Sequence, residues 1–189
     1  MKLNLNWQYQ KWRAIGCLVL GQKKMAITAF EEMLVCYPND SYVMMSLAHL
    51  YAEVGSKHDA ILLYKQLVNQ EKANASTWFN LGFMQEDAKQ FEDAEHSFRK
   101  ALSLDEDLDR AWYGLGLVLI QLNRLEEAVI ALKRNTKLQP MSPYAWYQLA
   151  RIHLDRHEPD EALKIIQHLK GFEPKVAAQL ERETGLKTS

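Results

Sequence analysis

The chain has 189 residues, with 23 Lys or Arg against 24 Asp or Glu, and its formal net charge is −1. Binding to nucleic-acid phosphates needs an excess of positive charge, so this balance argues against a nucleic-acid partner. No apolar run reaches the roughly 18 residues that a membrane-spanning helix needs. The start of the chain, MKLNLNWQYQKWR, lacks the apolar core of a secretory signal. We therefore expect a cytoplasmic protein that does not insert into a membrane.

Two cysteines and two sequons carry little functional signal in such a compartment. Cys17 and Cys36 serve there as small apolar residues, and no structural disulfide is expected. The sequons Asn39-Asp40-Ser41 and Asn74-Ala75-Ser76 are interpreted as turns and helix caps. Side chains of Asn, Asp and Ser accept hydrogen bonds from the first backbone N–H groups of a helix.

One spacing organises the chain: small, apolar and aromatic residues recur every 34 residues. A fixed period of about 20–50 residues is typical of proteins built from one stacked supersecondary unit. The recurring positions hold an alanine (Ala26, Ala60, Ala94, Ala128, Ala162), a large apolar residue (Met44, Trp78, Trp112, Trp146), a leucine (Leu47, Leu81, Leu115, Leu149) and a small residue (Ala14, Ala48, Gly82, Gly116, Ala150). The period divides the chain into blocks 7–40, 41–74, 75–108, 109–142 and 143–176.

The first block, 7–40, departs most from this pattern. Gln10 and Arg13 stand where the later blocks have a pair of bulky apolar residues. We interpret this block as an end repeat with a polar outer face, because stacked repeats need polar faces at their ends.

Each block predicts two helices joined by a turn. In block 75–108, Trp78, Leu81 and Gly82 have helical spacing, and Ala94 and Phe98 begin a second apolar stripe. The position between the two halves suits a left-handed residue that closes the first helix, and it holds Gly21, Gly55, Lys89, Asn123 and His157. Proline follows the second helix at Pro38, Pro140 and Pro174, where a helix cannot continue.

The last residues predict one further helix, over about 174–184. Val176, Ala177 and Leu180 would face inward, and Gly185 would close the helix. Since no helix pair of this kind can bury its stripe alone, neighbouring hairpins must stack into a solenoid. The final helix would then cover the apolar flank of the last hairpin.

The motif Trp-x2-Leu-Gly, in Trp78–Gly82 and again in Trp112–Gly116, resembles the tetratricopeptide repeat. With the alanine, the large apolar residue and the proline that follow, the resemblance covers nearly the whole chain. It implies an all-α fold, a right-handed α-solenoid of five 34-residue helix-turn-helix repeats plus a C-terminal capping helix, within a single domain 1–189. It also implies that the first helices line a concave groove that receives a peptide or helix of another protein.

The first helices are unusually apolar on the side opposite their core, where a solvated face would be polar. Seven of ten such positions are apolar or aromatic, and a contiguous exposed apolar strip is typical of a binding site. The candidate groove residues are Tyr42, Met45, His49, Phe79, Phe83, Arg110, Tyr113, Leu117, Tyr144, Tyr147 and Arg151. The alternative for any single one is that it packs between neighbouring first helices.

The strip predicts a partner segment with apolar anchors and a few charges, because aromatic residues dominate interface hot spots. The Lys, Asn and Arg clamp by which Hsp70- and Hsp90-binding members of the family hold a C-terminal carboxylate is absent: Asn80 and Arg110 are only a fragment of it. The sequence thus predicts an adaptor, scaffold or chaperone-like module. The alternative is a structural module that self-assembles through its end faces.

Catalytic and metal sites are not expected. His153 and His157 are four residues apart, but no third clustered ligand, HExxH or CxxC accompanies them. The acidic run before the fourth block fits capping of its first helix. We therefore predict no enzyme activity, no cofactor and no metal.

Overall fold

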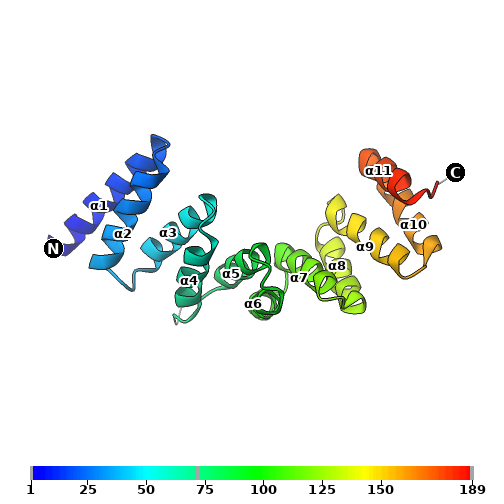
Figure 1. Ribbon diagram of the computed structural model, residues 1–189, viewed down its shortest axis with the longest axis horizontal. Coiled ribbons are helices and arrows are strands. Elements are labelled where there is room, and N and C mark those ends of the chain that lie inside the picture. Colours follow the sequence, from blue (N-terminus) through cyan, green and yellow to red (C-terminus); the bar gives the residue numbers. More distant parts are fainter. Residues whose placement is uncertain (1, 71–72, 188–189) are drawn as a thin grey trace. The chain divides into compact units, whose positions relative to one another are not determined.

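The computed structural model describes residues 2–70 and 73–187, and within these ranges it contains α-helices and no strand. The helices are α1 (Lys2–Val19), α2 (Lys23–Cys36), α3 (Ser41–Glu53), α4 (Lys57–Val68), α5 (Ala75–Asp87), α6 (Phe91–Leu104), α7 (Asp109–Gln121), α8 (Leu125–Leu138), α9 (Pro143–Asp155), α10 (Pro159–Lys170) and α11 (Pro174–Thr184) (Figure 1). This order agrees with the predicted fold class, in which helix pairs are followed by one further helix. The division into the five blocks of one domain stays a prediction.

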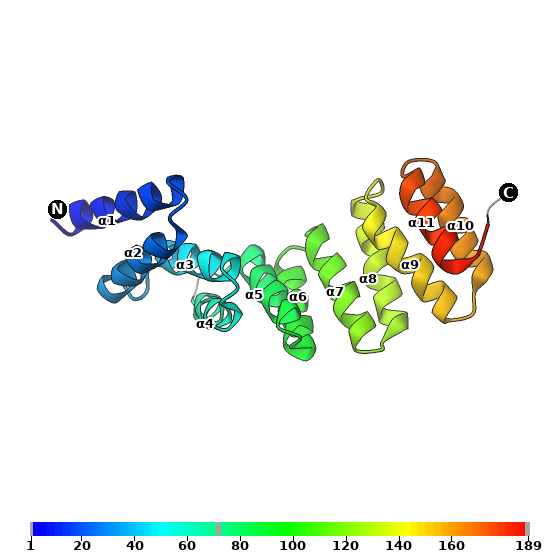
Figure 2. The same ribbon diagram turned by 45° about the horizontal axis from the view of Figure 1, so that its top comes forward.

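The chain forms two compact units, residues 1–90 and 91–189. In the first unit, α1 to α5 pack each against the next in the chain. In the second unit, α6 to α10 do the same, and α11 packs on α10 and touches α9 (Figure 2). Packing mainly between helices that are neighbours in the chain is the expected behaviour of a helical-repeat protein.

The first helix of each pair ends in the way that the turn residues predict. Gly21 and Gly55 have φ of 70° and 82°, and Lys89, Asn123 and His157 have φ of 57–61°. The turn at Asn123 is representative: its N–H donates to the Ile120 carbonyl, and the N–H of Arg124 donates to the Leu119 carbonyl, at 3.0 and 2.9 Å. These two bonds satisfy carbonyls at the helix end that would otherwise lack partners, and they require one left-handed residue.

Helix starts also follow the sequence. Asp40 Oδ1 accepts the N–H groups of Tyr42 and Val43 at 3.0 Å, and Asn74 Oδ1 accepts that of Thr77 at 2.9 Å. The interpretation of these two sequon segments as helix caps is therefore confirmed for Asp40 and Asn74.

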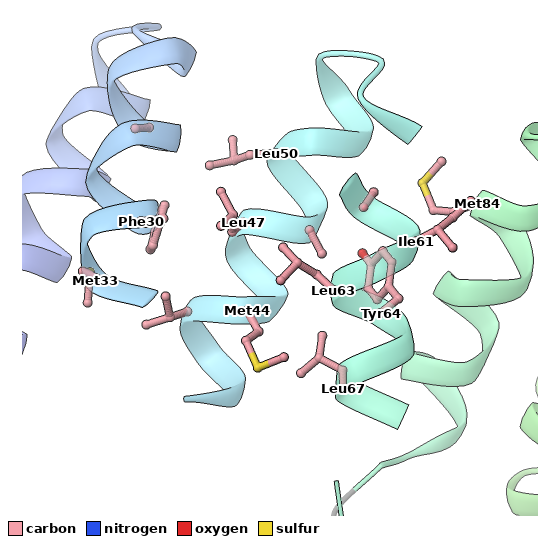
Figure 3. Close-up of a cluster of buried hydrophobic side chains, with 14 of the residues drawn as sticks. Phe30, Met33, Met44, Leu47, Leu50, Ile61, Leu63, Tyr64, Leu67 and Met84 are labelled. Carbon is pink, nitrogen blue, oxygen red and sulfur yellow. The ribbon is translucent and has the colours of Figure 1, made fainter. Parts of the chain in front are cut away.

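The recurring alanines are all fully buried: Ala26, Ala60, Ala94, Ala128 and Ala162. Around them, Phe30, Leu47 and Tyr64 fill the core of the first unit (Figure 3). In the second unit, Gly116 lies so close to α8 that a Cβ there would be 2.7 Å from Leu132. The 34-residue pattern of side-chain sizes therefore reports the approach of paired helices.

The recurring tryptophans have a second role that side-chain size alone does not predict. Trp112 Nε1 donates to the Glu106 carbonyl at 2.8 Å, and Trp146 Nε1 donates to the Pro140 carbonyl at 3.0 Å. Each indole therefore holds the loop that leads into its own helix, because a partly buried indole N–H needs an acceptor.

The predicted polar outer face of the first block is wrong. Arg13 pairs with Glu32 of α2, and Gln10 is half-buried, so both side chains turn toward the chain's own helices. The outer face of α1 instead exposes Leu5, Tyr9 and Trp12. Gln10 and Arg13 occupy core-facing positions of the repeat, equivalent to the buried Met44 and Leu47, so their polarity does not make the outer face polar.

Candidate functional site

All eleven candidate groove residues lie on the first helices of their pairs, and none of them is buried. In the first unit, α3 carries Tyr42, Met45 and His49, and α5 carries Phe79 and Phe83. In the second unit, α7 carries Arg110, Tyr113 and Leu117, and α9 carries Tyr144, Tyr147 and Arg151.

In the first unit, Tyr42 belongs to an aromatic cluster with α1. Its ring centre lies 5.7 Å from that of Trp7, and Lys11 Nζ lies 4.3 Å from the Tyr42 centroid. Trp7 Nε1 donates to Asp40 Oδ2 at 3.0 Å, which fixes the indole beside the start of α3. A cation already occupies the faces of these rings, so the cluster is held within the protein.

Phe79 and Phe83 form the more open apolar contact surface of this unit. Their rings stack, with centroids 6.3 Å apart and planes inclined by 24°, and Phe83 is 53% exposed. Farther along the helices the surface becomes charged: Lys57 pairs with Asp87 at 2.8 Å. Burial, with a smaller contribution from Asp87, raises the pKa of Glu86.

The second unit contains a hollow of about 280 Å³ formed by three helices. Tyr113 of α7 and Tyr144 of α9 meet at one side, with ring centres 6.4 Å apart. The hollow is lined by Tyr113, Pro143, Tyr144, Tyr147, Gln148, Val176 and Gln179, and we call it the tyrosine pocket. Its walls are aromatic, and its polar groups are amides and phenols that can both donate and accept hydrogen bonds.

One wall of the tyrosine pocket is fixed by a hydrogen-bond network between α9 and α11. The Tyr147 hydroxyl donates to Glu183 Oε2 at 2.6 Å, and Gln179 Nε2 donates to Glu183 Oε1 at 2.8 Å. The bonds from Tyr147 and Gln179 lower the pKa of the Glu183 carboxyl, and the bond to Glu183 raises the pKa of Tyr147. Arg151 lies over the Tyr147 ring, 5.9 Å from its centre.

A second hollow of about 460 Å³ continues along the same helices. It is lined by Arg151, Leu154, Asp155, Glu183 and Thr184. Charges of both signs therefore stand at one end of the aromatic surface, where they can pair with charges of a bound segment.

The sequence prediction missed the contribution of α11. Val176, Gln179 and Glu183 line the two hollows, although the final helix was expected only to cover the last hairpin. Ala177 and Leu180 do face inward and are fully buried. The i, i+3, i+7 spacing of the three missed residues was the available signal for a second functional face on this helix.

The two histidines spaced four apart are not brought together. His153 is buried, with Nδ1 2.6 Å from Glu158 Oε2, whereas His157 is exposed at the turn after α9. Among the described residues, no group of three or more His, Cys, Asp or Glu is placed to hold a metal ion. No helix in the described ranges is long and apolar enough to cross a membrane.

Comparison with known structures finds the same fold in several proteins. The crystal structure of MamA superposes with a TM-score of 0.83 at 20% identity, over 97% of each chain. MamA from Desulfovibrio magneticus RS-1, residues 41 to the end, gives 0.80 at 17% identity, over 95% of this chain and 97% of that one. YrrB, described as a TPR protein with an unusual peptide-binding site, gives 0.78 at 16% identity, over 89% and 88%. At these identities the likeness shows the fold alone.

A sequence-level match identifies the family. No curated protein matches the chain significantly. A family model does: the one described as the Cilia and flagella-associated protein 70 middle TPR-like domain matches residues 44–171, more than half of the chain. The chain therefore belongs to the tetratricopeptide-repeat family, as a member of this TPR-like group.

Proposed function

We propose that this chain is a non-enzymatic interaction module, an adaptor or scaffold, that binds a segment of a partner protein on the aromatic faces of its first helices. The tyrosine pocket is the observation that carries the proposal: three tyrosines from two helices surround an open hollow that is also lined by the amides of Gln148 and Gln179. Its volume of about 280 Å³ lies just below the range of about 300–1,000 Å³ for small-molecule sites. A few side chains of a peptide fit such a hollow better than a cofactor does.

The partner chemistry follows from the pocket walls. Tyrosine offers a large, rigid contact area at low entropic cost, so an aromatic, aliphatic or proline side chain is the expected anchor. The amide of Gln148 can bond to the peptide backbone of the segment. Arg151 and Asp155 at the adjacent hollow favour a charged residue close to the anchor.

The first unit offers a second contact surface, which we assign to the same class of ligand. Phe79 and Phe83 stack and leave part of their rings exposed, with Met45 and His49 on the preceding first helix. Aromatic residues of this kind anchor interfaces through burial on binding. Tyr42 is the weakest candidate of the unit, because Trp7 and Lys11 already cover its ring.

The proposed compartment is the cytoplasm. Cys17 and Cys36 are free thiols, and Cys36 is exposed. Exposed unpaired cysteines are typical of proteins in reducing compartments.

YrrB, which shares the fold, is described as having a peptide-binding site, and this supports a peptide ligand here as well.

A displayed library of random peptides, selected on the immobilised chain, tests the pocket. Fluorescence anisotropy then compares the affinity of selected peptides for the wild type and for the double variant Tyr113→Ala/Tyr144→Ala. We expect the double variant to bind at least about 30-fold more weakly, the factor for a hot-spot loss of about 2 kcal/mol. Ile130→Ala is the matched control, since Ile130 is exposed on α8 and away from both hollows.

The unfolding midpoints of these variants decide how the result is read. Tyr113 and Tyr144 are partly exposed, so their replacement should change the midpoint little. Selected peptides that bind the double variant as tightly as the wild type would disprove the pocket. A large loss of stability would show that the tyrosines are structural.

A further inference from the structure

An apolar stripe runs along the outer face of α1. Leu5, Tyr9, Trp12 and Val19 recur at i, i+4, i+7 and i+14, which places them on one side of the helix. Their exposed fractions are 68%, 68%, 65% and 80%. We call these four residues the α1 stripe. Monomeric proteins rarely expose a continuous row of large apolar side chains, so the α1 stripe needs an explanation.

The later repeats show what the middle of this side of α1 corresponds to. The residues one to four periods after Tyr9 are all buried, and so are those after Gly16, which lies on the same side of the helix between Trp12 and Val19: Val43, Thr77, Ala111 and Ala145, and Leu50, Met84, Val118 and Ile152. Gly114 is three periods after Trp12. It faces α6, the second helix of the preceding pair, since a Cβ at Gly114 would lie 2.6 Å from Phe98 of α6. The part of α1 from Tyr9 to Gly16 therefore corresponds to a helix-stacking face that the described residues leave uncovered. The residues one to four periods after Val19 are exposed, so this end of the stripe has no stacking counterpart in the later repeats.

We infer that the α1 stripe pairs with the α1 stripe of a second copy of this chain. Charge is the first argument for this occupant. Between residues 5 and 19 only Lys11 and Arg13 are charged, and both are turned elsewhere: Lys11 lies over Tyr42, and Arg13 pairs with Glu32. Two copies of the stripe can meet without burying like charges, which would otherwise oppose self-association.

Shape is the second argument. In an antiparallel two-fold pair centred on Trp12, Leu5 of one copy lies opposite Val19 of the other, and Tyr9 lies opposite the helix turn that holds Ile15 and Gly16. A Cβ at Gly16 would have nothing within 4 Å, so the large phenol meets open space. Every other repeat has a larger apolar residue at this position, and α1 alone has the small one. The stripe is thus complementary to itself, as an isologous interface requires.

The last described helix, α11, does not offer a matching surface. The outward positions of α11 include Lys175, Ala178 and Arg182, and its apolar residues Ala177 and Leu180 are buried. A head-to-tail stack would press the α1 stripe against this polar face. The closed, two-fold pairing through α1 is therefore favoured over an open chain of copies.

The size of the contact predicts a weak dimer. Large apolar side chains bring about 150–250 Å² each when aromatic, so the stripe contributes on the order of 500 Å² per copy. The pair then buries about 1,000 Å² in total, at the lower limit of specific interfaces. We expect dissociation at micromolar concentration.

Light scattering and sedimentation over about 1–300 µM test the inference. The wild type should change from monomer to dimer and stop there. Trp12→Glu should stay monomeric with unchanged helicity, whereas Ile130→Glu, which places the same charge on another exposed apolar position, should dimerise like the wild type. A wild type that stays monomeric or forms open-ended assemblies, or a Trp12→Glu variant that still dimerises, would overturn it.

Gly16→Leu separates self-pairing from ordinary repeat stacking. In the two-fold pair, the introduced leucine side chain would fill the space that receives Tyr9, and dimerisation should weaken at least several-fold. A contact made as in the later repeats should instead tighten, because Leu50 is buried at the equivalent position. A tighter dimer therefore also contradicts the inference. The pairing is independent of the tyrosine pocket, so Tyr113→Ala/Tyr144→Ala should dimerise normally.

Discussion

The space around a glycine in a first helix of this fold differs from one position to another. At Gly114, a Cβ would lie 2.6–3.0 Å from three atoms of the Phe98 ring, which is itself fully buried. At Gly16, a Cβ would meet nothing within 4 Å. The same substitution therefore overpacks one site and merely lengthens a side chain into solvent at the other.

We expect Gly114→Ala to lower the free energy of unfolding by about 1 kcal/mol. Overpacking costs about 1–3 kcal/mol, and the better helix propensity of alanine offsets about 1 kcal/mol of that. Gly16→Ala carries only the propensity gain and should raise the free energy of unfolding by up to about 1 kcal/mol. Urea titrations of both variants, at concentrations where the chain is monomeric, provide the measurement. Two changes of the same sign would contradict this account of the crossing.

Single residues also explain what the sequence could predict. Fixed spacing predicts the buried alanines and the left-handed turn residues, because packing and backbone geometry repeat with the repeat. Spacing could not show that Trp7 and Lys11 would cover Tyr42, since that contact joins two helices through unrelated positions. The eleven groove residues were placed on the correct helices, but only the structure shows which of them surround a hollow.

At the scale of the helix, α11 both covers the last hairpin and lines the tyrosine pocket. Leu180 follows Trp146 by one period and is fully buried, but Glu183 follows the buried Leu149 by one period and is exposed. The pattern breaks within this single helix, which is why the sequence predicted its covering role and missed its part in the pocket. In α1 the prediction fails for another reason: the two polar residues Gln10 and Arg13 occupy core-facing positions, so they do not describe its outer face.

Tyr147→Phe should loosen α11. The substitution removes the hydroxyl that donates to Glu183 at 2.6 Å, so the carboxyl loses its partner on α9. We expect the amides of α11 to exchange hydrogen several-fold faster, with little change in the other helices. Tyr144→Phe is the matched control. Tyr144 is exposed, and its substitution removes a hydroxyl from the same pocket without changing a hydrogen bond to Glu183. Equal exchange in both variants would show that the bond does not hold α11.

At the scale of the whole molecule, the net charge is close to zero, but the surface carries many ion pairs. Hydrogen bonds and ion pairs lower the pKa of five glutamates: Glu53 beside Lys23, Glu127 beside Arg124, Glu158 beside His153, Glu161 beside Lys164 and Glu183 beside Tyr147. They are distributed over both units, so no single helix carries the effect. Glu86 is the exception, since burial raises its pKa.

These directions predict how stability depends on pH. A carboxyl whose pKa is lower in the folded state releases its proton more readily there. Its stabilising contribution is complete above the pKa of an unfolded glutamate, about 4.3, and disappears as the pH falls through the folded value. We therefore expect the free energy of unfolding to change little between neutral pH and about pH 5 and to decrease steadily below it.

Glu86→Gln tests the effect of a raised pKa, which is opposite to the lowered pKa of the five paired glutamates. A raised pKa means that the fold disfavours the carboxylate, so at neutral pH the neutral amide should stabilise the chain. The gain should vanish at acid pH, where Glu86 is itself protonated. Urea titrations from neutral pH to about pH 3.5 measure both curves, and Glu92→Gln, an exposed glutamate in the first turn of α6, is the control. If Glu86→Gln destabilised the chain at neutral pH, Lys57 rather than burial would dominate the environment of this carboxyl.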